Sequence, residues 1–352
     1  MDTAARVKVA SSEVGDGCPV FIIAEVGVNH NGDVAMALEL IEQAKRAGAD
    51  CVKFQTFKAE QVAVASAPKA EYQLHTTPPA ESQLEMLKKL EFPEGAYASV
   101  IRRCNELGII FMSTPYGPAD VELLSSFGVP AFKVASGQII ETTFLELVAL
   151  KGRPIFLSTG MATLSEVDDA VRAIRATGND QIVLLQCTTN YPSRPKDANL
   201  LAMSTMRQSF HTLVGYSDHT QSDTACIAAV ALGACTIEKH FTLDTSLPGP
   251  DHSTSYTPGQ FTTLVASIRE CEAERGHGLK IPTAAEVTNA KGMRRSIVAA
   301  FPLKAGSTIT PDVIAFKRPA TGISPRLLPV LVGRKLRVEV PADHIITWDE
   351  IL

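Results

Sequence analysis

The chain has 352 residues, of which 45% are hydrophobic and 20% are charged. This length suggests two domains or one large barrel with an appendage, and the composition is sufficient for a sizeable soluble core. The net charge of −5 argues against nucleic acid or an anionic membrane as the main partner, and no apolar run reaches the roughly 18 residues that span a bilayer.

Short apolar segments flanked by Gly, Pro or Asp recur along most of the chain and predict β-strands. The predicted strands are residues 20–25, 49–54, 109–113, 131–135, 154–158, 181–186, 212–216 and 235–240. Amphipathic stretches between them predict helices at 33–47, 84–107, 165–177, 222–232 and 258–274. This alternation favours a (β/α)8 TIM barrel. An open doubly wound sheet is the alternative, but no G-x-G-x-x-G motif follows the first strand.

The pattern changes near residue 283. Residues 294–352 are strand-like and punctuated by Pro and Gly, and two segments, 309–314 and 346–351, share the pattern I-T-x-D-x-I. Thr310 and Thr347 are predicted to cap short helical turns. We therefore predict a TIM-barrel domain over residues 1–282, a linker over 283–293, and a small mostly-β domain with pseudo-symmetric halves over 294–352.

The seven cysteines indicate a reducing compartment. Their number is odd, and no two of them have the C-x-x-C spacing of zinc or redox sites. Residues 1–17 are polar and mixed in charge, without the apolar centre of a secretory signal. We therefore expect a cytoplasmic protein with neither a disulfide framework nor a zinc centre.

Polar side chains gather at the carboxyl ends of the predicted strands, which is where the catalytic groups of a barrel lie. In chain order they include Glu25, Lys53, Gln55, Thr114, Lys133, Ser136, Ser158, Thr189, Tyr191, Ser217, His219, Glu238 and His240. Any one of them could be a hydrogen-bonded strand terminus, because buried polar groups need partners. Since all eight strands share the feature, we interpret the set as a site ringed by polar side chains.

Lys53 and Lys133 lie within otherwise apolar strands, and a buried lysine needs an anion. An internal pair with Glu25 or Glu238 is one interpretation. The other is an anionic ligand, and phosphate suits two ammonium groups with neighbouring hydroxyls.

His219 and His240 follow neighbouring predicted strands, which lie roughly 5 Å apart in a sheet. Two imidazoles there could share a labile divalent ion whose other ligands are water or substrate oxygens. The alternative is a single metal-free histidine that acts as an acid or a base. His252 lies in a predicted loop over the barrel and could belong to the site or not.

Seven motifs, taken together and in order, resemble the N-acetylneuraminate (sialic acid) synthase family. They are residues 23–32, 53–55, 113–115, 133–137, 157–161, 216–220 and 238–241. The tail, with Arg294, Arg295, Ser296 and 317–319, is similar to that family's antifreeze-like (SAF) domain. The resemblance covers essentially the whole chain and implies condensation of phosphoenolpyruvate with an N-acetylated mannose-type sugar.

The resemblance also implies a role for each matching residue. His219 and His240 match the ligands of Mn²⁺ or Mg²⁺, and Arg318 matches an arginine that reaches the sugar bound by the partner in a domain-swapped homodimer. Positions that bind phosphoenolpyruvate are matched by Lys53, Thr114, Lys133, Ser136 and Ser158. Positions near the sugar or the reacting centre are matched by Glu25, Gln55, Tyr191, Ser217 and Asp251, and Thr189 belongs to the same sugar-side loop. Glu25 is our first choice for the base that activates water.

Three departures from the family pattern fall on the sugar side. Gln138 stands where an acidic residue is common, residues 253–256 read Ser-Thr-Ser-Tyr in place of Lys-Ala-Ser-Leu, and Asn190 is displaced by one position. The sugar could therefore be N-acetylmannosamine or a di-N-acetylated trideoxymannose of the legionaminic acid type. A non-enzymatic carbohydrate-binding protein is an alternative of another kind, but it has no use for a metal site together with a phosphate cradle. A metal-dependent aldolase on the same barrel is a further alternative, but it would more naturally use a Schiff-base lysine and no phosphoenolpyruvate.

Overall fold

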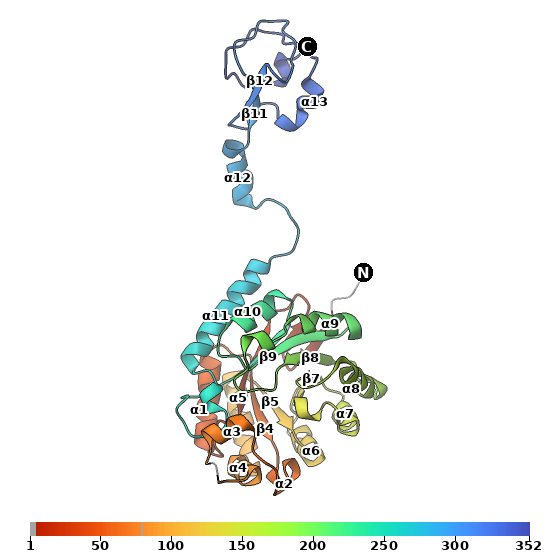
Figure 1. Cartoon of the computed structure of the whole chain (residues 1–352), viewed down its shortest axis with the longest axis vertical. Coiled ribbons are helices and arrows are strands. Elements are labelled where there is room, and N and C mark those ends of the chain that lie inside the picture. The colour runs from red at the N-terminus through yellow and green to blue at the C-terminus, as the bar shows by residue number, and fades with distance from the viewer. Residues whose placement is uncertain (1–4, 79) are drawn as a thin grey trace. The chain divides into compact units, whose positions relative to one another are not determined.

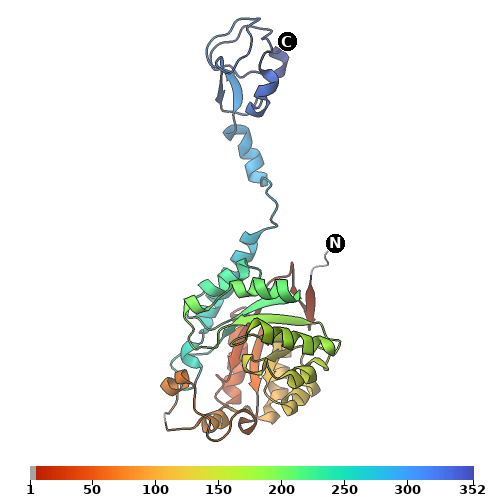
Figure 2. The same ribbon diagram turned by 45° about the vertical axis from the view of Figure 1, so that its right-hand side comes forward.

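The computed structural model describes residues 5–78 and 80–352, and the chain divides after Gly276 into two compact units. In the first unit, strands form a nearly closed barrel with helices outside it, as Figure 1 and the turned view in Figure 2 show. No helix within the described residues is long and apolar enough to cross a membrane.

The predicted TIM barrel is confirmed by one parallel sheet, which has eight strands among the described residues. They are β3 (Phe21–Gly27), β4 (Cys51–Thr56), β5 (Ile110–Pro115), β6 (Phe132–Val134), β7 (Ile155–Ser158), β8 (Ile182–Cys187), β9 (Leu213–Asp218) and β10 (Thr236–His240). Their order is β5-β4-β3-β10-β9-β8-β7-β6, and the two end strands β5 and β6 lie beside each other. All eight were expected from the sequence, with ends within two residues.

The strands are buried on both faces, and successive side chains alternate between two apolar clusters. On β3, Ile22 and Ala24 pack against the outer helices, whereas Phe21 and Ile23 pack inside the barrel. Glu25 therefore continues the inward row, and the same alternation points Lys53, Lys133 and His240 inward.

A hairpin of β1 (Arg6–Val9) and β2 (Ser12–Gly15), which the sequence analysis did not predict, adds three valines to the inner cluster. It packs on residues at the starts of the barrel strands and so lies at the end opposite their carboxyl termini.

Helices connect the strands, most of them on the outside of the barrel. They are α1 (Val34–Arg46), α2 (Ala59–Val62), α3 (Glu71–Thr76), α4 (Gln83–Leu90), α5 (Tyr97–Leu107), α6 (Pro118–Ser126), α7 (Thr142–Ala149), α8 (Leu164–Ala176), α9 (Leu201–Phe210), α10 (Thr224–Ala231) and α11 (Pro258–Arg275). The predicted stripe of α1 is observed, because Ala37, Leu40, Ile41 and Ala44 are buried.

The predicted single helix at 84–107 is wrong. The chain leaves α4 after Leu90 and resumes with a 3-10 turn at Glu94–Ala96 before α5. Pro93 explains the break, because the residue before a proline is forced away from helical angles.

The second unit begins with α12 (Ala284–Met293), whose side chains are all exposed or half-buried. Strands β11 (Ser296–Ala299) and β12 (Ile314–Lys317) pair antiparallel over a small apolar core that includes Ile309 and Ile346. Of the two predicted caps, Thr347 precedes a 3-10 turn at Trp348–Glu350, whereas Thr310 begins only a hydrogen-bonded turn.

Candidate active site

One cavity of about 370 Å³ opens at the carboxyl ends of the barrel strands. It is lined by every residue that the sequence analysis assigned to the barrel part of the site: Glu25, Lys53, Gln55, Thr114, Lys133, Ser136, Ser158, Thr189, Tyr191, Ser217, His219, His240 and Asp251. Arg318 belongs to the second unit, where its Nε donates to the Met293 carbonyl and its side chain is exposed.

Two lysines and two glutamates form the floor of this cavity. Lys53 Nζ lies 2.7 Å from Glu25 Oε2 and 3.7 Å from Glu238 Oε2, and Lys133 Nζ lies 3.9 Å from Glu238 Oε1. All four side chains are at most 5% exposed. The internal Lys–Glu pairing that the sequence left open is therefore observed, and it faces a cavity.

Burial sets the protonation of this cluster. It raises the pKa of Glu25 to about 7 although Lys53 opposes the shift. Burial also lowers the pKa of Lys133, and the distant Glu238 offsets this only in part. By contrast, burial would raise the pKa of Glu238, but Lys133 and Lys53 hold it below its ordinary value. The cluster is thus short of negative charge around Lys133, which favours an anionic ligand.

Hydroxyl groups surround the two ammonium groups. Thr114 Oγ1 accepts from Lys53 Nζ at 3.1 Å, and Ser136 Oγ accepts from the Gly160 amide at 3.0 Å. Ser158 Oγ is buried at the cavity and has no hydrogen-bond partner among the described residues. Because buried hydroxyls are normally paired, Ser158 is a free donor for a ligand oxygen.

His219 and His240 lie together at the end of β9 and β10, with ring centroids 5.3 Å apart. His219 Nδ1 is 2.7 Å from the Thr188 carbonyl, so Nδ1 carries a proton, and in the neutral ring the Nε2 lone pair is then available to a ligand. His240 Nδ1 is buried without a hydrogen-bond partner among the described residues and lies 3.9 Å from Asp251 Oδ2.

This pair fits a divalent ion that takes its remaining ligands from water or substrate. The fit rests on Nε2 of His219, on the Thr188 carbonyl that holds the proton of that ring on Nδ1, and on the unpartnered Nδ1 of His240. Among the described residues, no group of three or more His, Cys, Asp or Glu side chains could hold a metal by itself. Within the described residues, a metal ion at this pair would therefore need ligands from water or substrate as well.

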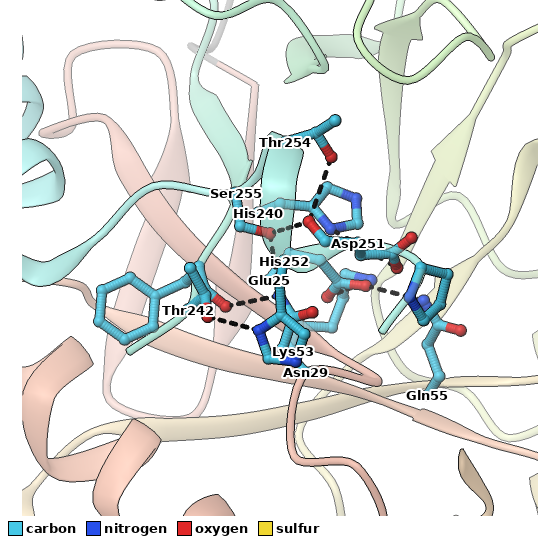
Figure 3. A network of polar contacts seen from close by, with 12 residues as sticks. Glu25, Asn29, Lys53, Gln55, His240, Thr242, Asp251, His252, Thr254 and Ser255 are labelled. Atoms are coloured by element: carbon cyan, nitrogen blue, oxygen red, sulfur yellow. Dashed lines mark hydrogen bonds and ion pairs between the residues drawn. The ribbon is translucent and has the colours of Figure 1, made fainter. Parts of the chain in front are cut away.

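A loop after β10 brings Asp251 to the cavity, as Figure 3 shows. The Asp251 carbonyl accepts from Ser255 Oγ at 2.6 Å and from Thr254 Oγ1 at 3.1 Å. Asn29 Nδ2, from the turn after β3, donates to Ser255 Oγ at 2.9 Å. His252 contacts Thr242 Oγ1 through Nδ1 at 2.7 Å and does not line the cavity, so it supports the loop.

Aromatic rings form one wall beside the histidines. Tyr191 lies 4.1 Å from the His219 ring and 4.9 Å from Tyr72, measured between centroids. Tyr72 comes from α3, a short segment that the sequence analysis did not predict. No periodic or motif signal marked it, because its position depends on the long connection between β4 and α4.

Glu238, which the sequence analysis offered as an internal partner of the lysines, and Gln138, which it named as a departure from the family pattern, both line the cavity. Glu238 Oε1 accepts from Ser217 Oγ at 2.8 Å, and the alternation that points His240 inward could have placed Glu238 there too. Gln138 Nε2 donates to the Tyr116 carbonyl at 3.2 Å, while its Oε1 is buried without a partner among the described residues.

Comparisons with known proteins agree with this geometry. Residues 40–280 match the NeuB family, and residues 294–352 match the SAF domain. The chain is 43% identical to the N,N'-diacetyllegionaminic acid synthase of Legionella pneumophila, over 96% of each chain. It is 35% identical to the human N-acetylneuraminate-9-phosphate synthase, over 95% of this chain and 93% of that one. The crystal structure of an N-acetylneuraminic acid synthetase from Leptospira borgpetersenii superposes with a TM-score of 0.73 at 32% identity, covering 81% of this chain and 95% of that one.

Proposed function

The chain belongs to the NeuB family, and we propose that it condenses phosphoenolpyruvate with an N-acetylated mannose-type amino sugar and water, releasing phosphate and a nonulosonic acid. One observation carries the proposal. A single cavity holds two buried lysines whose positive charge the nearby glutamates balance only in part and, beside them, two histidines that each have a ring nitrogen without a hydrogen-bond partner among the described residues. The lysines suit a substrate with two anionic groups, and the histidines suit a carbonyl that is activated through a metal.

In this proposal Lys53 and Lys133 hold the phosphate and carboxylate of phosphoenolpyruvate, with donors from Thr114, Ser136 and Ser158. His219 and His240 would hold Mn²⁺ or Mg²⁺, which when bound polarises the sugar aldehyde as a Lewis acid. Gln55, Thr189, Tyr191, Ser217 and Asp251 surround the sugar and orient its open chain.

The chemistry follows from this arrangement. Carbon 3 of phosphoenolpyruvate forms a bond to the aldehyde carbon, the aldehyde oxygen takes up a proton, and positive charge develops at carbon 2. Water adds to carbon 2 and loses a proton. The bond from carbon 2 to the phosphate oxygen then breaks, so that phosphate leaves with the bonding electrons and the hydroxyl on carbon 2 loses its proton to become the ketone of the product. The lysines stay on the phosphate throughout, so positioning and electrostatics carry much of the rate.

Glu25 is the base that we propose for the attacking water. Its pKa of about 7 means that the carboxylate is available only as the pH rises through neutrality. We expect kcat/KM to rise with pH, reach half of its plateau near 7, and lose this limb in a Glu25→Gln variant whose kcat falls about 10²- to 10⁴-fold. A pH profile of both proteins checks this, and an unchanged limb in Glu25→Gln would assign it to another group.

Two sugars are candidates, N-acetylmannosamine and 2,4-diacetamido-2,4,6-trideoxymannose. The second is favoured by an apolar wall of the cavity. Methyl groups of the sugar can pack on this wall, whereas a hydroxyl group buried against it would have no hydrogen-bond partner. This wall consists of Val28, Phe57, Val62, Met86, Leu87 and Leu90. The relative at 43% identity supports the same choice. Among the described lining residues, Lys53 and Lys133 are the only lysines or arginines, which argues against a sugar phosphate.

Phosphate release from phosphoenolpyruvate, measured against a panel of amino sugars, tests the proposal. We expect release that depends strictly on added sugar and is fastest with the trideoxy sugar. Faster turnover of N-acetylmannosamine would reverse the choice of sugar and keep the reaction. Sugar binding without phosphate release would instead identify a carbohydrate-binding protein.

The charge of the small domain and the position of Arg318 bear on how two copies of the chain could assemble. Residues 277–352 carry an excess of Lys and Arg over Asp and Glu, whereas the first unit carries the net negative charge of the chain. We propose a domain-swapped homodimer in which this domain, predicted at residues 294–352 after the 283–293 segment, caps the partner's barrel. Arg318 then donates to the N-acetyl carbonyl of the sugar.

Under this proposal Arg318→Ala raises the KM of the sugar about 10- to 100-fold and leaves phosphoenolpyruvate unaffected, because one charge-assisted hydrogen bond is lost. Mixing Arg318→Ala chains with His240→Ala chains tests the exchange. Each heterodimer then has one site with neither lesion, so at a sugar concentration far below the raised KM the mixture should be more active than either variant alone. Heterodimers that form and stay inactive would mean that each chain completes its own site.

A further inference from the structure

Behind the cavity, a second charged pair lies on the outer face of the barrel strands. Lys239 Nζ is 2.6 Å from Asp218 Oδ2, and the two side chains are 2% and 0% exposed. The residues are register partners on β10 and β9, and each directly precedes one of the histidines, His240 and His219. Neither lines the cavity, so neither can contact a substrate there.

Asp218 fixes the backbone on the far side of His219. Its Oδ1 accepts from the Thr220 amide at 2.8 Å, and its Oδ2 accepts from the Thr220 hydroxyl at 3.1 Å. Tyr216 donates its hydroxyl to Oδ1 at 3.0 Å as well. His219 is therefore the middle residue of a short turn whose two ends are tied to one carboxylate.

Lys239 closes the same arrangement from the other strand. Its ammonium group also donates to the Thr220 carbonyl and lies 4.2 Å from the centre of the Tyr256 ring. The Tyr256 amide donates to the His240 carbonyl at 2.8 Å, and its hydroxyl donates to Asp223 Oδ1 at 2.8 Å. His240 is thus held between Lys239 and a residue that packs on Lys239.

Stability alone does not account for such a pair, since replacing a buried ion pair with apolar groups is often neutral or stabilising. What it does supply is a rigid link between two strands, in a low dielectric where displacing either charge is costly. We propose that the Lys239–Asp218 pair is a positioning device that sets the spacing and orientation of His219 and His240 for the metal ion. This inference rests on the metal site of the proposed function.

The affinity for Mn²⁺ without substrates, followed by the electron paramagnetic resonance signal of the free ion, tests the pair directly. Lys239→Met alone leaves the buried charge of Asp218 without a counter-charge and can prevent folding. The main variant is therefore the double Lys239→Met with Asp218→Asn, in which both side chains are uncharged. We expect its dissociation constant for Mn²⁺ to rise about 10- to 100-fold, as is typical when outer-shell partners of metal ligands are lost. Its affinity for phosphoenolpyruvate, which depends on Lys53 and Lys133, should be unchanged.

A matched control is the double Lys69→Met with Glu81→Gln. It neutralises another buried pair in the same unit, 3.6 Å apart, that contacts neither histidine. We expect it to keep the Mn²⁺ affinity of the unaltered protein even if its thermal midpoint falls. A milder variant, Tyr256→Leu, keeps the ion pair, removes the ring over Lys239, and is expected to weaken Mn²⁺ binding by a smaller factor.

Each outcome decides the matter. Unchanged Mn²⁺ affinity in the Lys239 and Asp218 double variant, or in Tyr256→Leu if the double does not fold, overturns the inference. Equal weakening in both double variants also overturns it, because general loosening would then be the cause. If neither the unaltered protein nor His240→Ala binds Mn²⁺, the proposed metal site is wrong, and this inference is wrong with it.

Discussion

Replacing His219 or His240 by Ala is expected to lower kcat/KM by about 10³-fold or more, which corresponds to roughly 4 kcal/mol of barrier. The reason is geometric, since the two rings are 5.3 Å apart and no larger metal-binding group occurs among the described residues. In the proposed function each histidine would therefore provide half of the protein's ligands to the ion. Removing divalent ions from the unaltered protein should have the same effect, and adding Mn²⁺ should reverse it.

Steady-state kinetics after chelation, and Mn²⁺ titration of each variant, measure this. His211→Asn is the control, because His211 lies outside the cavity in the left-handed conformation that Asn tolerates. The variants should keep the thermal midpoint within a few degrees, since losing a ligand side chain at the cavity leaves the barrel core intact. Full activity in excess chelator would remove the metal from the proposed function.

The barrel could be predicted because its information is local. Each strand is a short apolar run with turn residues at its ends, and the α1 stripe follows the helical period. The error at 84–107 arose where apolar spacing continues across Pro93, so periodicity and backbone geometry gave opposite signals. The β1–β2 hairpin was missed because only three valines of its eight strand residues face the core.

The site could be predicted where it depends on strand ends. Glu25, Lys53 and His240 come from three strands whose carboxyl ends must meet, so topology alone brings them together. Tyr72 depends on the path of a long connection, and Lys239 depends on knowing which face of β10 meets α10 and α11. Lys53 pairs with both Glu25 and Glu238, whereas among the described residues Lys133 pairs only with Glu238. This difference depends on side-chain geometry that no pattern in the sequence predicts.

Lys133→Met is expected to weaken phosphoenolpyruvate binding about 10- to 100-fold while leaving the free energy of unfolding within roughly 1 kcal/mol. Burial lowers the pKa of Lys133, so the folded protein disfavours its ammonium form, and removing that charge costs the fold little. Glu238 keeps Lys53 and the Ser217 hydroxyl as partners. Lys53→Met should weaken binding as well but also destabilise the protein, because it leaves Glu25 and Glu238 without their nearest cation.

The contrast between the two lysines identifies what Lys133 is for. A structural lysine stabilises the fold when no ligand is bound, whereas a lysine kept for an anion gains most of its stabilisation when that anion binds. Calorimetric titration with phosphoenolpyruvate and urea unfolding of the same variants separate these roles. Lys45→Met controls for net charge, because Lys45 donates to the Gly108 carbonyl on the outer surface. If Lys133→Met unfolds at much lower urea while binding phosphoenolpyruvate normally, Lys133 serves the barrel, and the anion site must be sought elsewhere in the cavity.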